Sequence, residues 1–320
     1  MKQAEIDTRL TLVIPQKKGG VKSNKKWDKA KNIIGLIVTY IVLLFFAFVV
    51  IFPFFYMISA SFMDITTLNS GALLPDFGSF VDNVVYNYSQ IFDSASFDYG
   101  RLVGNTLLVG VTITCGSLIV TILSAYAFAR LNFRGRDFLF TIFLATMMIP
   151  GEMMIITNFT TMSNLGLISS SQSSFEAYLV LILPFFGNVF YIYLLRQTFK
   201  QIPNELYLAA KVDGKSDWQY LWHVMVPLSS QTIITILILN LIDAWNSYAW
   251  PSLVLVNSDF NVLSVALRGT SFLLYTHETY EVMYNWQMAA TVMTTVPLLL
   301  LFIIFRKYIM RGVARAGIKG

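Results

Sequence analysis

The chain has 320 residues, of which 56% are hydrophobic and only 13% are charged. Soluble domains carry about 25% charged residues, so this composition excludes a soluble globular protein and indicates an integral membrane protein. The net charge of +5 would suit a nucleic-acid partner, but the basic residues follow a membrane topology instead, and no nucleic acid is expected to bind.

Residues 1–32 are polar and carry nine lysines and arginines, and we expect them to form a basic cytoplasmic tail. Such residues beside a span are attracted to anionic lipid, by about 1 kcal/mol for each charge near the surface. The segment does not look like a signal peptide, because the apolar stretch that follows it is too long.

Six apolar segments follow, each long enough to cross a bilayer as a helix. These are residues 33–58, 102–129, 138–156, 177–195, 232–256 and 286–305. The third contains Pro150 and Gly151, and it is expected to kink or end there, because proline removes a backbone donor. The fourth contains Pro184 and Gly187.

The charges of the connecting segments predict the orientation. Segment 59–100 carries five aspartates and no basic residue, and we place it outside as a loop, together with loops 157–176 and 257–285. Of the 23 lysines and arginines, 21 then lie inside, and only Arg101 and Arg268 lie outside. Because basic segments stay in the cytoplasm, the sequence predicts an all-α polytopic membrane protein with six transmembrane helices in residues 33–305, both termini cytoplasmic and a cytoplasmic tail at 306–320.

A polar island at residues 201–230 separates the fourth span from the fifth. We predict that Pro203 begins a short helix, that Asp213 and Gly214 form a turn, and that Ser216 caps a second helix, which Pro227 interrupts. Apolar residues recur at helical spacing in both helices, at Leu206, Ala209, Ala210 and Val212 and at Trp218, Leu221, Trp222 and Met225. An amphipathic loop resting on the membrane surface is an equally simple interpretation.

Residues 209–216, AAKVDGKS, fit a loose phosphate-loop pattern. A true phosphate loop needs a buried strand before it and glycines that let backbone N–H groups approach the anion. Here a helical pattern precedes the motif and Asp213 would repel phosphate. We therefore expect no nucleotide to bind this chain.

The island resembles the cytoplasmic loop of the membrane subunits of binding-protein-dependent ABC importers. That loop reads Glu-Ala-Ala, three residues, Gly, nine residues, Ile, one residue, Leu-Pro. The matching positions here are Leu208, Ala209, Ala210, Gly214, Val224, Val226 and Pro227. Leu208 replaces the glutamate of the motif, although Glu205 lies one turn earlier at a position that is often acidic in these loops.

The resemblance extends from the first span to the end of the chain. It is greatest to the carbohydrate-uptake branch, the class of the smaller permease subunit of the maltose transporter. The supporting stretches are residues 105–107, 125–135, 145–151, 195–197, 245–246, 250–251 and 311–320.

The resemblance implies that the chain is a permease subunit of an ATP-driven importer in a bacterial inner membrane. A second permease subunit would complete the path, two ATPase subunits would hold the ATP and Mg²⁺, and an extracellular binding protein would deliver a sugar. This chain would then be a transport subunit, not an enzyme, with no cofactor of its own. The residues expected to form the ATPase-coupling loop are Glu205, Leu206, Leu208, Ala209, Ala210, Asp213, Gly214, Trp218 and Pro227.

Asp243 lies near the middle of the fifth span, where an unpaired charge costs at least about 2.5 kcal/mol. It should therefore face a partner group or a wet cavity. Carboxylates, amides and aromatic faces together suit a sugar, although polar residues in spans also bond neighbouring helices and the partner permease could hold the sugar instead. The candidate substrate path is Asn240, Asp243, Trp245, Asn246 and Trp250.

Two further regions take their expected roles from the resemblance. The last outside loop would contact the binding protein through Tyr275, His277, Glu278 and Tyr280. The C-terminal tail would reach the ATPases through Arg311, Arg315 and Lys319. A plain surface loop and a basic membrane anchor are the alternatives.

The main alternative function is an ion-gradient-driven secondary transporter or channel subunit, with Asp243 as a proton or cation relay. Few ionisable residues in the spans and no repeat of two similar halves speak against it. A membrane-embedded enzyme is excluded because the spans hold no set of catalytic residues. One cysteine and two distant histidines also predict no metal site.

Overall fold

The computed structural model describes residues 25–94, 97–169, 171–256, 260–270, 272–276 and 279–317. It forms two units, Met1–Tyr56 and Met57–Gly320. The first unit contains most of α1 (Lys25–Ser61), a helix that begins eight residues before the predicted span and contains Pro53. Its apolar side chains between Ile33 and Phe55 are largely exposed, as expected for a surface that contacts lipid or another membrane subunit.

The second unit consists almost entirely of helices, which confirms the predicted all-α fold. Some of its candidate spans are continuous and others are bent. Its continuous long helices are α4 (Tyr99–Arg130) and α15 (Tyr284–Gly317). Three further pairs of helices are long and apolar enough to cross a membrane together, each bent by more than 40°. With α1, the described residues therefore hold three continuous candidate spans, or six if each bent pair is one span.

The bends lie where the sequence breaks the helical hydrogen-bond ladder. The first bent pair joins α5 (Arg136–Thr146) to η1 (Gly151–Met153) and α6 (Met154–Asn164) at 83°, which confirms the predicted break at Pro150. The second joins α7 (Ser174–Ile182) and η2 (Leu183–Phe185) to α8 (Val189–Gln201) at 50°, with Pro184 in η2.

The third bent pair corrects the prediction for Pro227. The segment α10 (Asp217–Tyr220), η3 (Leu221–Met225) and α11 (Val226–Leu228) stays helical through this proline and meets α12 (Ser230–Asn246) at 79°. The π-helical turn η3 lies directly before Pro227 and adapts the hydrogen-bond ladder near a residue without an N–H. The bend follows at Ser229.

Four predicted segments differ from the structure. The fifth span, predicted as continuous over 232–256, ends at Asn246, and a separate helix α13 (Ala249–Val254) follows. Helix α6 continues to Asn164 through part of the predicted loop 157–176. The predicted outer loops are also structured. They contain α2 (Ile65–Asn69), α3 (Phe80–Phe92), α14 (Leu263–Gly269) and a hairpin of β1 (Leu273–Thr276) and β2 (Thr279–Val282).

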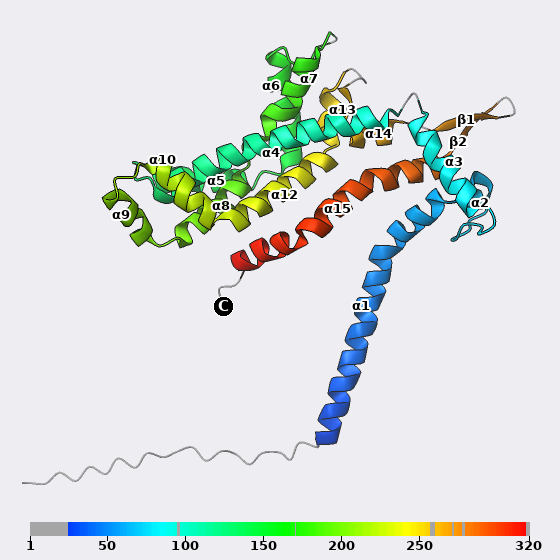
Figure 1. Ribbon diagram of the computed structural model, residues 1–320, viewed down its shortest axis with the longest axis horizontal. Coiled ribbons are helices and arrows are strands. Elements are labelled where there is room, and N and C mark those ends of the chain that lie inside the picture. The colour runs from blue at the N-terminus through cyan, green and yellow to red at the C-terminus, as the bar shows by residue number, and fades with distance from the viewer. Residues whose placement is uncertain are drawn as a thin grey trace, which may run out of the picture. The chain divides into compact units, whose positions relative to one another are not determined.

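Several elements of the second unit pack along helix α4 (Figure 1). Its 32 residues extend about 48 Å at 1.5 Å per residue. Helices α8 and α12 pack against α4, and α15 packs against α12. The island, with α9 (Asn204–Val212) and α10, lies at one end of α4, while α2, α3 and the hairpin lie at the other (Figure 1).

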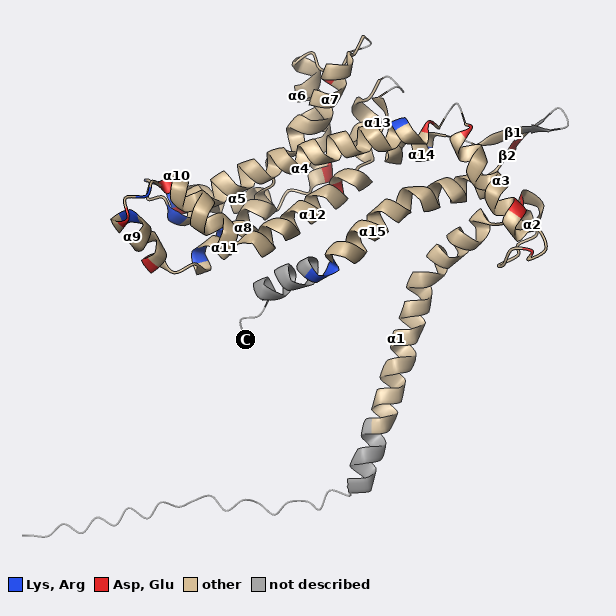
Figure 2. Ribbon diagram, in the orientation of Figure 1, with Lys and Arg blue, Asp and Glu red and all other residues tan. Residues whose placement is uncertain are grey.

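Charges are distributed unevenly between these two ends. Figure 2 shows described lysines and arginines gathered around α5, α8 and α9, and acidic residues near α2 and α3 at the opposite end. This distribution agrees with the charge bias that predicted the orientation.

A buried amide pair stabilises the end of the unit that carries α3. Asn87 donates through Nδ2 to the carbonyls of Ser61 (2.9 Å) and Met63 (2.8 Å). Asn285 donates through its own Nδ2 to Asn87 Oδ1 (2.9 Å) and to Met63 O (3.2 Å). The pair therefore joins α3, the start of α15 and the turn after α1.

We expect Asn87→Leu to lower the melting temperature of the purified complex, because the substitution removes the side-chain donor to the Ser61 carbonyl and one of the two acceptors of Asn285 Nδ2. A buried polar group left without a partner costs about 1–3 kcal/mol. The matched control is Asn69→Leu, since Asn69 is exposed at the end of α2. Thermal unfolding in detergent measures both variants, and equal melting temperatures would contradict the role of the amide pair.

Candidate functional site

The island folds as two helices that meet at a glycine turn, as the sequence predicts. Helix α9 ends in a Schellman motif, in which Gly214 N donates to Lys211 O (3.1 Å) and Lys215 N donates to Ala210 O (2.9 Å). Gly214 adopts a φ of +71°, a conformation that glycine reaches without the steric cost of a Cβ. Ser216 then forms a capping box with Gln219 at the start of α10, which confirms the predicted cap.

The outer side of these two helices carries exposed apolar side chains. Val212 is 88% exposed, Trp218 60%, Leu208 56% and Leu206 42%. With the exposed Ala209, these five residues form a surface that we call the elbow patch. Exposed apolar surfaces rimmed by polar residues mark interaction sites.

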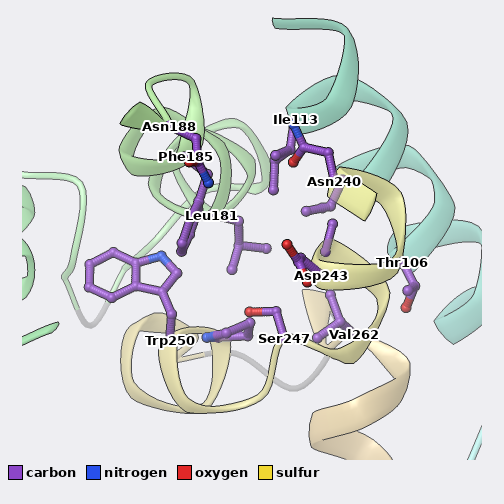
Figure 3. A pocket seen from close by; sticks show the side chains of 13 residues that line it. Thr106, Ile113, Leu181, Phe185, Asn188, Asn240, Asp243, Ser247, Trp250 and Val262 are labelled. Atoms are coloured by element: carbon purple, nitrogen blue, oxygen red, sulfur yellow. The ribbon is translucent and has the colours of Figure 1, made fainter. Parts of the chain in front are cut away.

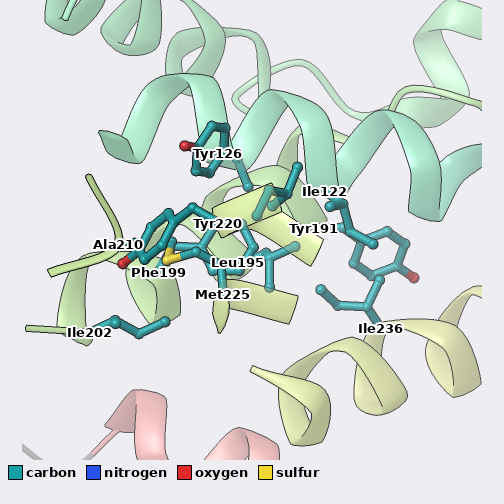
Figure 4. Close-up of a cluster of buried hydrophobic side chains, with 12 residues drawn as sticks. Ile122, Tyr126, Tyr191, Leu195, Phe199, Ile202, Ala210, Tyr220, Met225 and Ile236 are labelled. Carbon is teal, nitrogen blue, oxygen red and sulfur yellow. The ribbon is translucent and has the colours of Figure 1, made fainter. Parts of the chain in front are cut away.

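Ala210 does not belong to the elbow patch, although the predicted helical face included it. It is 6% exposed and packs in a cluster that joins the island to α4, α8 and α12 (Figure 4). Tyr220, Leu221 and Met225 of the island lie in the same cluster, against Ile122 of α4. Of the two predicted alanines, Ala209 is therefore available for docking and Ala210 belongs to the core of this chain.

A carboxylate joins the island to α4 by hydrogen bonds. Asp217 Oδ1 accepts from the hydroxyls of Tyr126 (3.1 Å) and Tyr207 (3.0 Å) and from Lys211 Nζ (3.1 Å). The hydrogen bond to this carboxylate raises the pKa of Lys211 above its usual value, so Lys211 stays charged at neutral pH. Asp217 is not among the predicted site residues, because its two tyrosine partners lie 91 and 10 positions away in the sequence.

Arg130, at the last turn of α4, holds the start of the island from a second side. Its Nη2 donates to the carbonyls of Phe199 (3.1 Å) and Ile202, and its Nη1 donates to Asn204 Oδ1 (3.3 Å). These groups span the end of α8 and the first residue of α9. In the sequence, Arg130 is one of the basic residues that predict the orientation, and its contacts show a further, structural role in positioning the island.

Arg196 makes a similar attachment between α8 and the turn after α4. It is buried, donates through Nε to Phe128 O (3.1 Å) and lies 3.7 Å above the ring of Phe140. Its Nη2 also pairs with Asp137 (3.4 Å). This arginine therefore fixes α8 against the end of α4 and the start of α5.

A cavity of about 240 Å³ lies between α4, α7, α12 and α13 (Figure 3). It is lined by Thr106, Val109, Ile113, Leu181, Phe185, Asn188, Asn240, Asp243, Ala244, Ser247, Trp250, Pro251 and Val262. Three of the five predicted substrate-path residues are among them: Asn240, Asp243 and Trp250. Trp245 packs instead in the cluster around Leu263 and Trp286, and Asn246 is exposed and donates to Ile242 O (3.0 Å).

Some polar groups of the cavity have hydrogen-bond partners within the chain and one does not. Asp243 Oδ2 accepts from the hydroxyl of Tyr191 (2.7 Å), and Trp250 Nε1 donates to Val180 O (3.0 Å). Thr106 Oγ1 accepts from Leu263 N (2.8 Å), which fixes the start of α14 against α4. Asn240 is 5% exposed and its Nδ2 has no hydrogen-bond partner.

The predicted contacts with the binding protein and with the ATPases fall in the β1–β2 hairpin, in helix α15 or outside the described residues. Tyr275 and Tyr280 are paired across the β1–β2 hairpin, and the Tyr280 side chain is exposed. The predicted contacts at His277, Glu278 and Lys319 lie outside the described residues. Arg311 and Arg315 belong to helix α15. Among the described residues, no group of three His, Cys, Asp or Glu side chains is placed to hold a metal ion.

Comparisons with known proteins agree with this architecture. Residues 117–315 match the family described as binding-protein-dependent transport system inner membrane component. The arabinooligosaccharides transport system permease protein AraQ of Halalkalibacterium halodurans is 32% identical over 279 residues, which cover 86% of this chain and 94% of that protein.

Two further proteins are similar over most of the chain. The sn-glycerol-3-phosphate transport system permease protein UgpE of Yersinia pestis is 30% identical, over 68% of this chain and 73% of that protein. A chain from the crystal structure of a bacterial ABC transporter that imports the acidic polysaccharide alginate is 28% identical, with a TM-score of 0.74 and coverage of 87% of this chain and 97% of that one.

Proposed function

Because the chain belongs to the family of binding-protein-dependent transport system inner membrane components, we propose that it forms half of the translocation path of an ATP-driven sugar importer. The family makes the chain a transport subunit and not an enzyme, and it displaces the alternative of an ion-gradient-driven transporter. A second permease subunit would complete the path and an extracellular binding protein would deliver the sugar.

The elbow patch is the observation that carries the proposal. Its side chains protrude from a turn fixed by a Schellman motif and a capping box, and the hydrogen bonds of Asp217 and Arg130 attach this turn to α4. An ATPase subunit bound to the patch would therefore transmit its movement to α4 and α8 as rigid-body motion. ATP and Mg²⁺ would stay on the ATPase.

The distribution of basic residues supports an orientation of the chain in the membrane. We place the island, Arg130 and the end of α15 in the cytoplasm, because a group of described basic residues gathers around α5, α8 and α9 (Figure 2). The α3 helix and the β1–β2 hairpin then face the outside, where Tyr275 and Tyr280 would contact the binding protein. The chain would be a multi-pass protein of a bacterial inner membrane with both termini cytoplasmic.

A sugar is the substrate class that the relatives support, since AraQ is named for arabinooligosaccharides and the solved transporter imports a polysaccharide. UgpE is named for a phosphorylated polyol, sn-glycerol 3-phosphate, which an uptake panel must include. The test is reconstitution of the chain with its partner permease, ATPases and binding protein in liposomes. Sugar uptake that requires both ATP and the binding protein is expected. Uptake driven by an ion gradient without ATP would overturn the proposal.

The substitution Val212→Asp is expected to reduce co-purification of the ATPase subunits at least tenfold. Val212 is the most exposed residue of the elbow patch, and covering an unpaired carboxylate with another subunit costs more than the roughly 1.4 kcal/mol that corresponds to tenfold. The matched control is Val81→Asp, at the exposed Val81 of α3 on the other end of the unit. Equal ATPase recovery in both variants would remove the elbow patch from the docking surface.

A further inference from the structure

We propose that the cavity between α4, α7, α12 and α13 binds one ring of a neutral sugar and discriminates against anionic solutes. The inference rests on the proposed function and narrows its substrate class. A preference for neutral sugars distinguishes this chain from similar proteins named for anionic substrates, such as sn-glycerol 3-phosphate and alginate.

The cavity lies beside two breaks between helices, one within a candidate span and one at the end of α12. Phe185 and Asn188 line it at the break between α7 and α8, and Ser247 and Trp250 line it at the break between α12 and α13. Irregular backbone at membrane depth is tolerated only where protein buries it or where it lines a water-filled cavity. Discontinuous helices that meet at one place are also typical of substrate sites in transporters.

Its polar groups can satisfy the hydroxyls of a sugar. Tyr191 occupies one oxygen of Asp243 at 2.7 Å, which orients the carboxylate and leaves it further capacity to accept hydrogen bonds. In Figure 3, Asp243 points into the space between Asn188, Trp250 and Ser247. The buried and unpartnered Nδ2 of Asn240 supplies a donor for a hydroxyl or ring oxygen.

The rest of the wall is apolar and suits the C–H faces of a ring. Leu181, Val109 and Ile113 contribute aliphatic surface, and Trp250 contributes an indole whose N–H is already bonded to Val180 O. The volume of about 240 Å³ lies below the roughly 300–1,000 Å³ of sites for drug-sized ligands. One ring, and not a whole oligosaccharide, therefore matches the space.

The charges around the cavity disfavour an anion. Asp243 is the only lining residue with an ionisable side chain among those described. Arg268 stacks on the ring of Tyr248 at 4.2 Å and does not line the cavity. The N-terminus of α8 would attract an anion, but Asn188 Oδ1 already accepts from Phe190 N (3.0 Å) and Tyr191 N (3.4 Å). A phosphate or uronate would thus meet a carboxylate, with no cation among the described lining residues to offset the repulsion.

The test measures equilibrium binding to the complete complex of permeases and ATPases in nanodiscs, without the binding protein. The neutral probes are arabinotriose, maltotriose and cellotriose, and the anionic probes are an alginate trisaccharide and sn-glycerol 3-phosphate. We expect at least one neutral probe to bind tenfold or more tightly than either anion. Asp243→Asn should lower the ratio of neutral to anionic affinity at least tenfold, since it removes a charged acceptor and the repulsion together.

Asp82→Asn is the matched control, because it makes the same charge change at an exposed position of α3 and should leave the affinity ratio unchanged. If Asp243 had only a structural role, Asp243→Asn would lower the affinity for all probes alike and leave the affinity ratio unchanged. That result would overturn the inference. Equal binding of neutral and anionic probes to the unmodified complex, or binding of none, would also overturn it. Intact ATP-driven uptake alongside any of these results would leave the proposed function standing.

Discussion

Replacement of Arg130 by methionine is expected to reduce ATP-driven uptake at least tenfold while the complex still assembles. Methionine keeps much of the length of the side chain but removes the hydrogen bonds to Phe199 O, Ile202 O and Asn204 Oδ1. Hydrogen bonds to a charged group contribute about 1.5–3 kcal/mol each. Without them the segment between α8 and α9 can move independently of α4, so closure of the ATPases would displace the island without moving the spans.

The measurement is the number of sugar molecules imported per ATP hydrolysed in liposomes. Arg134→Met is the matched control, since Arg134 follows in the same turn and its side chain is exposed. We expect near-normal coupling in this control and continued ATP hydrolysis with little uptake in Arg130→Met. A normal ratio of uptake to hydrolysis in Arg130→Met would show that the attachment of Arg130 does not transmit the movement.

Arg130 and Asp217 together attach the island to the end of α4. Arg130 holds the residues before α9, and Asp217 holds α10 to Tyr126 on the same helix. The hydrophobic cluster of Ala210, Tyr220 and Leu221 fills the space between these attachments (Figure 4). A force applied to the exposed elbow patch is therefore distributed over polar and apolar contacts, and no single hinge separates the patch from the spans.

The sequence predicted the spans because each carries a long apolar run and because lysine and arginine separate the two sides. It also predicted the glycine turn at Gly214 and the cap at Ser216, since both depend on local backbone chemistry. It could not predict which apolar face is buried within the chain. In a membrane protein, Ala210 and Leu208 are both apolar, but only the packing of the island on α4 and α8 decides which of them is exposed.

Contacts between distant residues were the main part of the site that the sequence did not show. Asp217 and Tyr126 are 91 positions apart, and no local pattern joins them. The substrate path was predicted only in part, because the sequence did not indicate a break in the fifth span. A break after Asn246 separates Trp245 from Trp250, so Trp245 packs in the outer cluster while Trp250 lines the cavity. The apolar run of this region had predicted one continuous span.

A close approach at Gly116 determines how the broken span packs beside the cavity. A Cβ added to Gly116 would lie closer than 3.0 Å to three ring atoms of Phe186, at the break between α7 and α8. We expect Gly116→Ala to lower the stability of the complex by about 1–3 kcal/mol, because overpacking forces the ring or the backbone to shift. The melting temperature of the purified complex and its yield after size-exclusion chromatography measure the effect.

Gly104→Ala is the matched control on the same helix, since a Cβ at Gly104 meets no atom of this chain within 4 Å. Alanine is favoured over glycine in helices by roughly 0.5–1 kcal/mol, so this control should be neutral or stabilising. Phe186→Ala should be less harmful in the Gly116→Ala background than alone, because it removes the ring that the new methyl group strikes. Additive effects of the two substitutions would show that the clash is relieved elsewhere. A non-additive rescue would establish that the Gly116–Phe186 contact positions the break whose residues Phe185 and Asn188 line the cavity.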